Sequence, residues 1–267
     1  MMRIDLERLR TLLADEPFIR RIELTEETPS TNLLAKELAR QGAQSGTLVI
    51  AQKQTAGRGR RGRSWESGEG TSLAMSILLR PGFSAEKASR ITQAAALGMC
   101  RTLRHFGADA KIKWPNDILV NGRKLVGILS EFGMEGEKLS YIVCGIGVNV
   151  GQRGFSGELS EIAGSLYTET GVLVPREAVA AHAVKALAPL FCACEEEAAY
   201  QKLLSDYRQN CLTLGQSVKV IGTDAVRYGT AADIDEEGRL LLRQEDGSLF
   251  TVHAGDVSIR PVSNGAV

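Results

Sequence analysis

The chain has 267 residues, of which 43% are hydrophobic and 24% are charged, and this composition is typical of a folded globular protein rather than a disordered chain. Its 32 lysine and arginine residues balance its 32 aspartate and glutamate residues, so no overall charge would draw it to nucleic acid or to an anionic membrane. The length suffices for one large domain or two smaller ones, and any basic function must be local.

The N-terminal part shows helical and strand patterns around one glycine-rich segment. Residues 3–14 place apolar side chains at helical spacing, and Ser30 or Thr31 is suited to cap a second helix. Two short apolar runs predict buried strands, and the segment 57–70 between them, dense in glycine and arginine, predicts an irregular loop. The predicted strands are residues 47–51 and 73–79.

The middle of the chain adds the longest periodic segment. Residues 86–106 carry apolar side chains at steps of three and four, which predicts a long amphipathic helix. A hairpin is predicted at 118–129 around Asn121-Gly122, followed by a strand at 141–150 that we expect two glycines to interrupt. Because strands and helices mix without strict β-α-β alternation, the pattern favours an α+β fold with a mixed sheet. The interrupting glycines are Gly145 and Gly147, and two further helices are predicted at 176–191 and 195–209.

The composition changes near residue 212. Short apolar runs between turn residues follow, among them 218–220, 240–242 and 249–259, and this pattern predicts a small β-barrel. We therefore divide the chain into a main domain, residues 1–211, and a C-terminal domain, residues 212–267. The chemistry is expected in the main domain, because the barrel is too small to carry it alone.

The sequence carries no sign of export or membrane insertion. No apolar stretch reaches the length of a membrane span, and residues 1–8 lack the apolar core of a signal peptide. Five cysteines without a CxxC pair predict reduced thiols, so we expect a cytoplasmic protein. His105, His182 and His253 lie far apart without metal-ligand spacing, and we interpret them as unrelated residues rather than a zinc centre.

Four arginines interleaved with glycines occupy residues 57–64. This segment matches the dinucleotide pattern GxGxxG and, except for Arg63 in place of lysine, the phosphate-binding pattern GxxxxGK[ST]. Both patterns need a helix to begin at once, whereas residues 65–70 contain two more glycines, so we reject both. Neighbouring guanidiniums repel one another on a loose backbone, so we expect a loop that is mobile until an anion neutralises it. Such arginines suit a site where two anions are brought together; a solvated basic loop and a nonspecific RNA contact stay open as alternatives.

A second polar cluster, KIKWPND, occupies residues 111–117. Its Trp-Pro step forces an extended turn, which predicts that Lys113, Asn116 and Asp117 lie near one another. Lys124 follows just past the Asn-Gly turn, at the start of a strand. A lone lysine there is most often a solvated strand end, but its neighbours favour a functional role.

Taken together, these segments resemble the biotin–protein ligases. The resemblance is strong over residues 28–150 and rests on five motifs whose order and spacing are highly specific. They are STN at 30–32, GRGRRGRSW at 57–65, KWPND at 113–117, RKLVGIL at 123–129 and GIGVN at 145–149. The resemblance implies a catalytic domain of the class II synthetase type, with a mixed sheet flanked by helices, and a C-terminal SH3-like barrel.

The reaction that the resemblance implies has two steps. The biotin carboxylate attacks the α-phosphate of ATP to give biotinoyl-5′-AMP and pyrophosphate. A lysine of a biotin carboxyl carrier protein, a subunit of acetyl-CoA carboxylase or a related carboxylase, then takes the biotinyl group and releases AMP. ATP and biotin are substrates, Mg²⁺ is required, and no cofactor is tightly bound.

The resemblance also implies residue roles. Lys124 and Arg60 are the expected catalytic residues, because cations relieve the repulsion between a carboxylate and a phosphate. Trp65 is expected to cover the adenine and Asn149 to bind its edge, while Mg²⁺-ATP lies near Asn116 and Asp117. The residues implied for biotin are Ser30, Thr31, Asn32, Gln54, Arg58, Gly59, Arg60, Lys124 and Gly127. Those implied for ATP and the adenylate are Arg58, Arg60, Arg63, Trp65, Lys113, Asn116 and Asn149.

One departure from the family and two alternatives complete the interpretation. Members that double as repressors place a helix-turn-helix domain before the ligase, and the 29 residues before Ser30 are too few for it, so we expect no DNA partner. A lipoate–protein ligase of similar fold would lack the arginine loop and the WPND segment. A noncatalytic RNA- or protein-binding module gives no reason for Lys124 or Asn149. The sequence leaves open the role of the barrel and the oligomeric state, a homodimer included.

Overall fold

The computed structural model describes residues 3–66, 68–222, 225–252 and 256–259. Its main part is a seven-stranded mixed sheet in the order β1-β2-β3-β7-β6-β5-β4, in which β1 and β2 are parallel and the other neighbours antiparallel. The predicted α+β fold with a mixed sheet is confirmed. The strands are β1 Arg21–Thr28, β2 Thr47–Gln54, β3 Ser72–Leu79, β4 Lys111–Lys113, β5 Asp117–Val120, β6 Arg123–Glu135 and β7 Lys138–Asn149.

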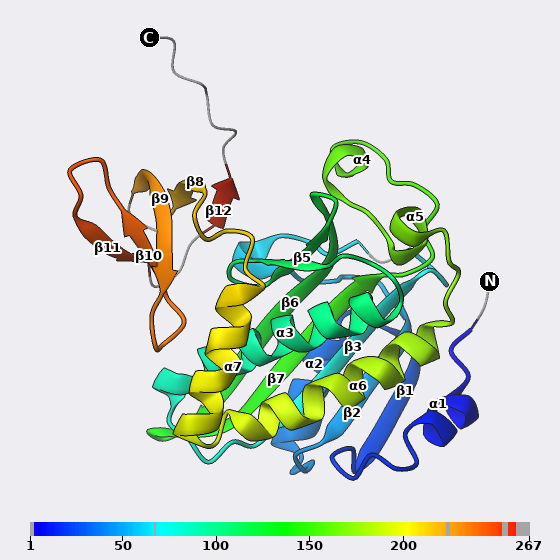
Figure 1. Cartoon of the computed structure of the whole chain (residues 1–267). Helices are drawn as coiled ribbons and strands as arrows, with labels where there is room; N and C mark the ends of the chain where they lie inside the picture. The colour runs from blue at the N-terminus through cyan, green and yellow to red at the C-terminus, as the bar shows by residue number, and fades with distance from the viewer. Residues whose placement is uncertain (1–2, 67, 223–224, 253–255, 260–267) are drawn as a thin grey trace.

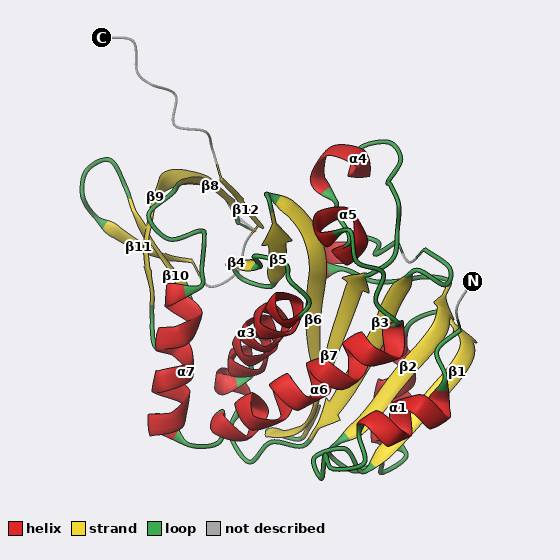
Figure 2. Ribbon diagram, turned by 45° about the vertical axis from the view of Figure 1, so that its right-hand side comes forward, coloured by secondary structure: helices red, strands yellow, loops and turns green. Residues whose placement is uncertain are grey.

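Helices cover both faces of this sheet (Figures 1 and 2). α3 and α6 lie side by side across one face, flanked by α1 and α7, whereas α2 packs on the opposite face. The helices are α1 Leu6–Leu12, α2 Thr31–Arg40, α3 Ser89–His105, α4 Leu159–Ile162, α5 Leu166–Thr170, α6 Arg176–Ala193 and α7 Glu197–Gln209. Within the described ranges, none of the helices combines the length and apolarity needed to cross a bilayer.

The strand alternation gives the two faces of the sheet different side chains. On the α3 and α6 side, residues such as Met75, Ile128 and Ile146 belong to the large apolar core of the protein. On the α2 side, a smaller cluster forms, in which Ala35 and Leu38 of α2 pack with residues of β2, β3 and β7. The rest of that second face, beside α2, is left for the cavity described below.

Three local predictions need correction. β7 is unbroken from Lys138 to Asn149, so Gly145 and Gly147 do not interrupt it. The long helix α3 begins at Ser89, after a short 3-10 turn, rather than at 86. Ser30 stands at the N-cap of α2, but its side chain makes no capping hydrogen bond; Gln54 accepts one from the Thr31 backbone amide at 3.0 Å instead.

The C-terminal part is a separate five-stranded antiparallel sheet in the order β11-β10-β9-β8-β12. Its strands are β8 Ser217–Ile221, β9 Val226–Ile234, β10 Leu240–Arg243, β11 Leu249–Val252 and β12 Asp256–Ile259. The domain boundary at residues 211 and 212 stays a prediction. β1, β4 and β9 were not predicted from the sequence pattern.

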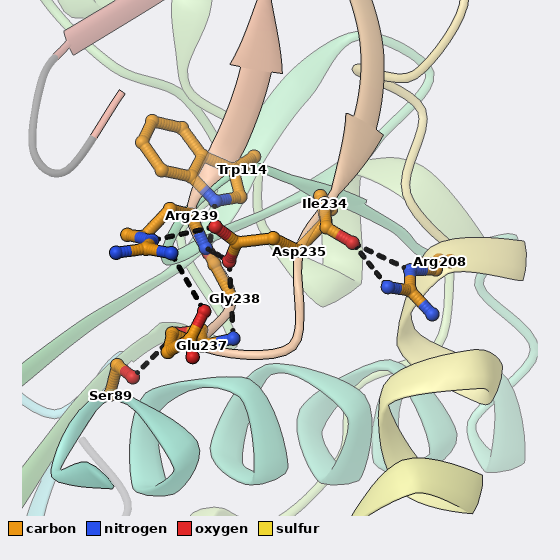
Figure 3. A network of polar contacts seen from close by, with 8 residues as sticks. All are labelled: Ser89, Trp114, Arg208, Ile234, Asp235, Glu237, Gly238 and Arg239. Atoms are coloured by element: carbon orange, nitrogen blue, oxygen red, sulfur yellow. Dashed lines mark hydrogen bonds and ion pairs between the residues drawn. The ribbon is translucent and has the colours of Figure 1, made fainter. Parts of the chain in front are cut away.

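A tight loop between β9 and β10 joins this sheet to the main domain (Figure 3). The backbone carbonyl of Gly238 accepts a hydrogen bond from Trp114 Nε1 at 3.0 Å, and that of Glu237 accepts one from Ser89 Oγ at 2.8 Å. An ion pair between Asp235 and Arg239, at 2.6 Å, stabilises the loop itself. Because Trp114 lies two residues before Asn116, the C-terminal sheet supports the turn that carries Asn116 and Asp117, which the sequence predicts to lie near Mg²⁺-ATP.

Candidate active site

A row of small residues crosses four neighbouring strands on the α2 side of the sheet. Ala51 of β2 pairs with Ala74 of β3, Ala74 pairs with Gly147 of β7, and Gly147 pairs with Gly127 of β6. Since each side chain is a methyl group or a hydrogen, the sheet surface is hollowed along this row. The resulting cavity is lined by Ser30, Thr31, Asn32, Gln54, Arg58, Gly59, Arg60, Arg63, Ser64, Trp65, Ala74, Asn116, Asp117, Lys124, Gly127, Ile128, Leu129, Gly145, Ile146 and Gly147.

The indole of Trp65 lies directly over this row. A Cβ atom at Gly147 would stand 2.5 Å from the indole, and one at Gly127 would stand 2.7 Å from it, so both positions must be glycine. Trp65 Nε1 is buried and has no hydrogen-bond partner among the described residues. Gly127 of β6 and Gly147 of β7 therefore make room for an aromatic ring in the hollow of the sheet surface.

The arginine-glycine loop closes one side of the cavity. Its ends are joined by backbone hydrogen bonds from Gly59 to Arg63 at 2.7 Å and from Trp65 to Gly57 at 2.9 Å. The loop is more regular than predicted, because Arg60–Gly62 form a short 3-10 turn. The φ angle of Arg61 is 55°, in the left-handed region.

Three arginines of the loop point to three different elements. Arg58 NH1 donates to Glu131 Oε1 of β6 at 3.3 Å, and Arg60 NH1 donates to Asn116 Oδ1 at 3.1 Å. Arg61 NH1 donates to a backbone carbonyl of β8, that of Ile221, at 2.8 Å. The protein's own oxygens thus hold the guanidiniums apart, which offsets part of the repulsion that the sequence predicts.

Lys124 and Asp117 form an ion pair at the same side of the cavity. The hairpin of β5 and β6, with the predicted Asn121-Gly122 turn, brings Lys124 Nζ to 2.6 Å from Asp117 Oδ1. Lys124 Nζ also lies 5.6 Å from the centre of the Trp65 ring. Lys124 and Arg60 contact the neighbouring residues Asp117 and Asn116 and so form a cationic end of the cavity. Arg58 and Arg63 line the cavity as well.

The other end is lined by uncharged polar groups around the start of α2. The Ser76 hydroxyl lies 2.8 Å from Thr31 Oγ1 and 2.7 Å from Asn32 Oδ1. Gln54 Oε1 accepts the hydrogen bond from the Thr31 amide noted above. This end offers small, fixed donors and acceptors inside a partly apolar pocket, which suits a neutral polar ring of a ligand.

The structure brings together most of the predicted site residues. All nine predicted biotin residues line the cavity, as do Arg63, Trp65, Asn116 and Asp117. Lys113, at the end of β4, and Asn149, at the end of β7, are not among the lining residues. The Asn149 amide is buried, and it donates to Gly164 O at 3.0 Å and accepts from Gln152 Nε2 at 3.1 Å. The individual roles of all these residues stay predictions.

Two polar residues of this region escaped the sequence reasoning. Ser76 is fully buried within β3, and its only sequence signal is that it is the one polar residue in the otherwise apolar run 73–79. Glu131, on β6, accepts hydrogen bonds from Asn32 Nδ2 at 2.9 Å and Lys36 Nζ at 2.8 Å. Burial raises the pKa of Glu131, but hydrogen bonds from Lys36 and Asn32 and the charges of Lys36 and Arg58 outweigh it and hold that pKa below its usual value.

His105 and His182 are not among the residues that line this cavity. His105 at the end of α3 and His182 of α6 are stacked, with ring centres 3.8 Å apart, so the interpretation as unrelated residues is wrong for this pair. Burial, the charge of His105 and that of Lys185 hold the pKa of His182 below its usual value. His253 lies outside the described residues. Across the described ranges, no three His, Cys, Asp or Glu side chains gather as a metal site would need.

Comparisons with known proteins agree with this geometry. The biotin/lipoate A/B protein ligase family matches residues 20–149, and the biotin protein ligase C-terminal domain matches residues 213–260. A bifunctional ligase/repressor BirA from Bacillus spizizenii is 37% identical over 86% of this chain and 71% of its own length. A biotin–[acetyl-CoA-carboxylase] ligase from Mycobacterium tuberculosis is 34% identical over 89% of this chain and 88% of its own. The structure of a biotin protein ligase from Aquifex aeolicus in complex with biotin and ATP has a TM-score of 0.77 and 27% identity, covering 91% of this chain and 99% of that one.

Proposed function

The chain belongs to the biotin protein ligase family, and we propose that the cavity on the α2 side of its sheet is where it joins biotin to AMP and then to a carrier lysine. The enzyme is an ATP-dependent biotin–protein ligase. The observation that carries the assignment of the site is the convergence of all nine predicted biotin residues on one cavity, with cations at one end and neutral polar groups at the other.

In the first step, a biotin carboxylate oxygen attacks the α-phosphorus of ATP, the bond from that phosphorus to the bridging oxygen breaks, and pyrophosphate leaves. At the cationic end, Lys124 pairs with Asp117, and Arg60 donates to Asn116, the preceding residue in the chain. There they lower the repulsion between the two anions and stabilise the charge that develops on the phosphate oxygens. The polar end, with Asn32 and Thr31, holds the ring system of biotin.

In the second step, the neutral amine of a carrier lysine attacks the acyl carbon of the biotinyl adenylate. The anhydride C–O bond breaks, AMP leaves with the electron pair, and the amine loses a proton. Trp65 covers the small-residue row and the arginine loop lines the same cavity, and together they keep water from the anhydride. The acceptor is a biotin carboxyl carrier domain of a carboxylase, as the printed names of the relatives suggest.

ATP enters as its Mg²⁺ complex, with no cofactor resident. Asn116 and Asp117 supply the oxygen atoms that Mg²⁺ prefers, and both line the cavity. The predicted adenine contacts of Trp65 and Asn149, the phosphate contact of Lys113 and the division of the chain into residues 1–211 and 212–267 remain part of the proposal. So do the cytoplasmic location and the absence of a DNA partner, which a gel shift with operator-like duplexes checks.

The experiment that tests the function is pyrophosphate release from Mg²⁺-ATP by the intact chain, with biotin, with lipoate and with neither acid. We expect release that depends on biotin, followed by transfer of labelled biotin to a carrier lysine. Release with lipoate alone would identify a lipoate ligase. If neither biotin nor lipoate causes pyrophosphate release, the chain would be a noncatalytic binding module. Either of these two results would overturn the proposal.

A further inference from the structure

Glu131 links the start of α2 to the arginine loop, although it is not one of the residues that line the cavity. Its Oε2 atom accepts from Asn32 Nδ2 at 2.9 Å, at the polar end. Its Oε1 atom accepts from Arg58 NH1 at 3.3 Å, on the arginine loop. One carboxylate thus contacts both α2 and the arginine loop, which are separate segments of the chain.

The contacts of Asn32 fix which way its amide faces. Asn32 Nδ2 donates to the backbone carbonyl of Leu129 at 3.0 Å as well as to Glu131, and both partners can only accept. The amide oxygen therefore faces Ser76 Oγ, at 2.7 Å. The Asn32 side chain held in this way is part of the cavity lining. Asn32 is 3% exposed, so a reversed amide would bury unpaired groups.

The same carboxylate sets where Arg58 lies. Arg58 is half exposed and would otherwise be repelled by the neighbouring arginines of its loop. Glu131 is 18% exposed and is also paired with Lys36 Nζ at 2.8 Å, so its charge is shielded from water and shared by two cations. The Glu131 contact fixes one nitrogen of a guanidinium that also lines the cavity, and its other N–H groups take no part in this ion pair.

We propose that Glu131 is a positioning residue of the biotin site, orienting the Asn32 amide toward the ligand and anchoring Arg58 at the cavity edge. This inference rests on the proposed function. It makes a specific distinction: the contacts to Asn32 and Arg58 matter for activity, whereas the ion pair with Lys36 serves the structure alone.

Glu131→Gln and Lys36→Met separate these two roles. A glutamine has one acceptor oxygen in place of two and presents N–H groups to donors, so it cannot serve Asn32 and Arg58 together. We expect Glu131→Gln to raise the KM for biotin about tenfold to a hundredfold, the factor that follows from losing a hydrogen bond with a charged partner. Lys36→Met removes the shortest ion pair of Glu131 but neither contact to the site, and its KM for biotin should stay within about twofold of the wild-type value.

A double-mutant cycle adds a readout that a purely structural role would not give. If Glu131 acts on biotin partly through Asn32, Glu131→Gln should raise the KM for biotin by a smaller factor in an Asn32→Ala background than in the wild-type background, because only the Arg58 contact is left to lose. Glu131→Asp, which keeps the charge but withdraws it by one methylene, should fall between wild type and Glu131→Gln and serves if the glutamine variant does not fold.

The outcomes are distinct from those of the functional test. Biotin-dependent pyrophosphate release by the wild-type protein is measured first, and its absence would reject the function itself. An active wild type with an equal KM for biotin in Glu131→Gln, or with equal increases in Glu131→Gln and Lys36→Met, would overturn the positioning role alone.

Discussion

The two faces of the central sheet are built from the same strands but end as different environments. Ile146 and Val148 of β7 face the helices α3 and α6 and join the large core, whereas Gly145 and Gly147, the alternate residues, face α2 and the arginine loop. On the face toward α3 and α6, large side chains pack against those of the helices and leave no space for a ligand. Small ones on the other leave room for Asn32 and Trp65 and, as we propose, for the substrates.

The difference between the two faces shows that a sheet can form a cavity where small side chains replace large ones. Ala51, Ala74, Gly147 and Gly127 stand in register across four strands, so the hollow requires no break in the hydrogen bonding of the sheet. The chemistry then comes from segments that reach over the hollow from outside: the arginine loop, the start of α2 and the hairpin that carries Lys124. The core face supplies rigidity, and the cavity face supplies the reactive groups.

The largest effect on activity is expected from a substitution on the cavity face. Lys124→Ala should lower the rate of biotin-dependent pyrophosphate release by about 10²- to 10³-fold, because it removes a cation aimed at developing negative charge. Folding should be kept, since Lys124 is partly exposed and pairs with Asp117 at the cavity edge. Lys138→Ala, at the exposed start of β7, is the matched control and should be as active as wild type. Activity in Lys124→Ala equal to that of the control would remove Lys124 from the catalytic machinery.

A methyl group on the same face should affect substrate binding. A Cβ at Gly145 would stand 2.0 Å from Asn32 Oδ1, so Gly145→Ala must displace an amide that three hydrogen bonds hold. We expect the KM for biotin to rise about tenfold or more, as for the loss of a hydrogen bond to a buried polar group. Steady-state kinetics check this, with Gly154→Ala as the control, because a Cβ at Gly154 meets no atom within 4 Å.

The core face should respond in stability and not in activity. Ile142→Val removes one buried methylene from the core face of β7, at a residue that does not line the cavity, and should lower the free energy of unfolding by about 0.5–1.5 kcal/mol. Its kcat and KM per folded molecule should stay at wild-type values. Urea denaturation and kinetics on the same sample test both statements, and a changed KM for biotin would show that the two faces are not independent.

The smallest effect concerns pH. Glu197, on the helical side, accepts hydrogen bonds from Arg90, Gln201 and Lys87, which lower its pKa from 4.5 to about 2; the pKa of Glu131, on the cavity side, is also lowered. A carboxylate with a lowered folded-state pKa stabilises the protein fully above its unfolded pKa, and this contribution is lost as the pH falls through the folded value. The urea midpoint of wild type should therefore fall between pH 4.5 and pH 2 more than that of Glu197→Gln. If the urea midpoints of the two proteins fall in parallel as the pH is lowered, the lowered pKa of Glu197 would be contradicted.

The sequence predicts local features well. The Asn-Gly hairpin, the long helix and the arginine loop each depend on neighbouring residues, and the motifs that contain Arg60, Asn116 and Lys124 could be placed in one site by resemblance. Features that depend on cross-strand register could not. Gly145 and Gly147 suggested a broken strand, because their role is visible only once Asn32 and Trp65 stand against them.

Long-range packing accounts for the remaining differences. Ser76 and Glu131 became recognisable only when β3 and β6 were paired with β7, which places both beside Asn32. The His105–His182 stack depends on how α3 packs on α6, and neither helix indicates it alone. The inclusion of Asn149 in the adenine site came from a motif, whereas its amide is bonded to the segment that follows β7.

The most direct test of the account is a calorimetric titration of biotin into the wild-type chain and into Gly147→Val. A valine at position 147 would project into the centre of the small-residue row, where even a Cβ would stand 2.5 Å from the Trp65 indole. We predict that biotin binds the wild-type protein and that a folded Gly147→Val variant shows no binding heat, while Gly154→Val binds as wild type does. Equal affinities in wild type and a folded Gly147→Val variant would contradict the placement of the substrate site on this face of the sheet.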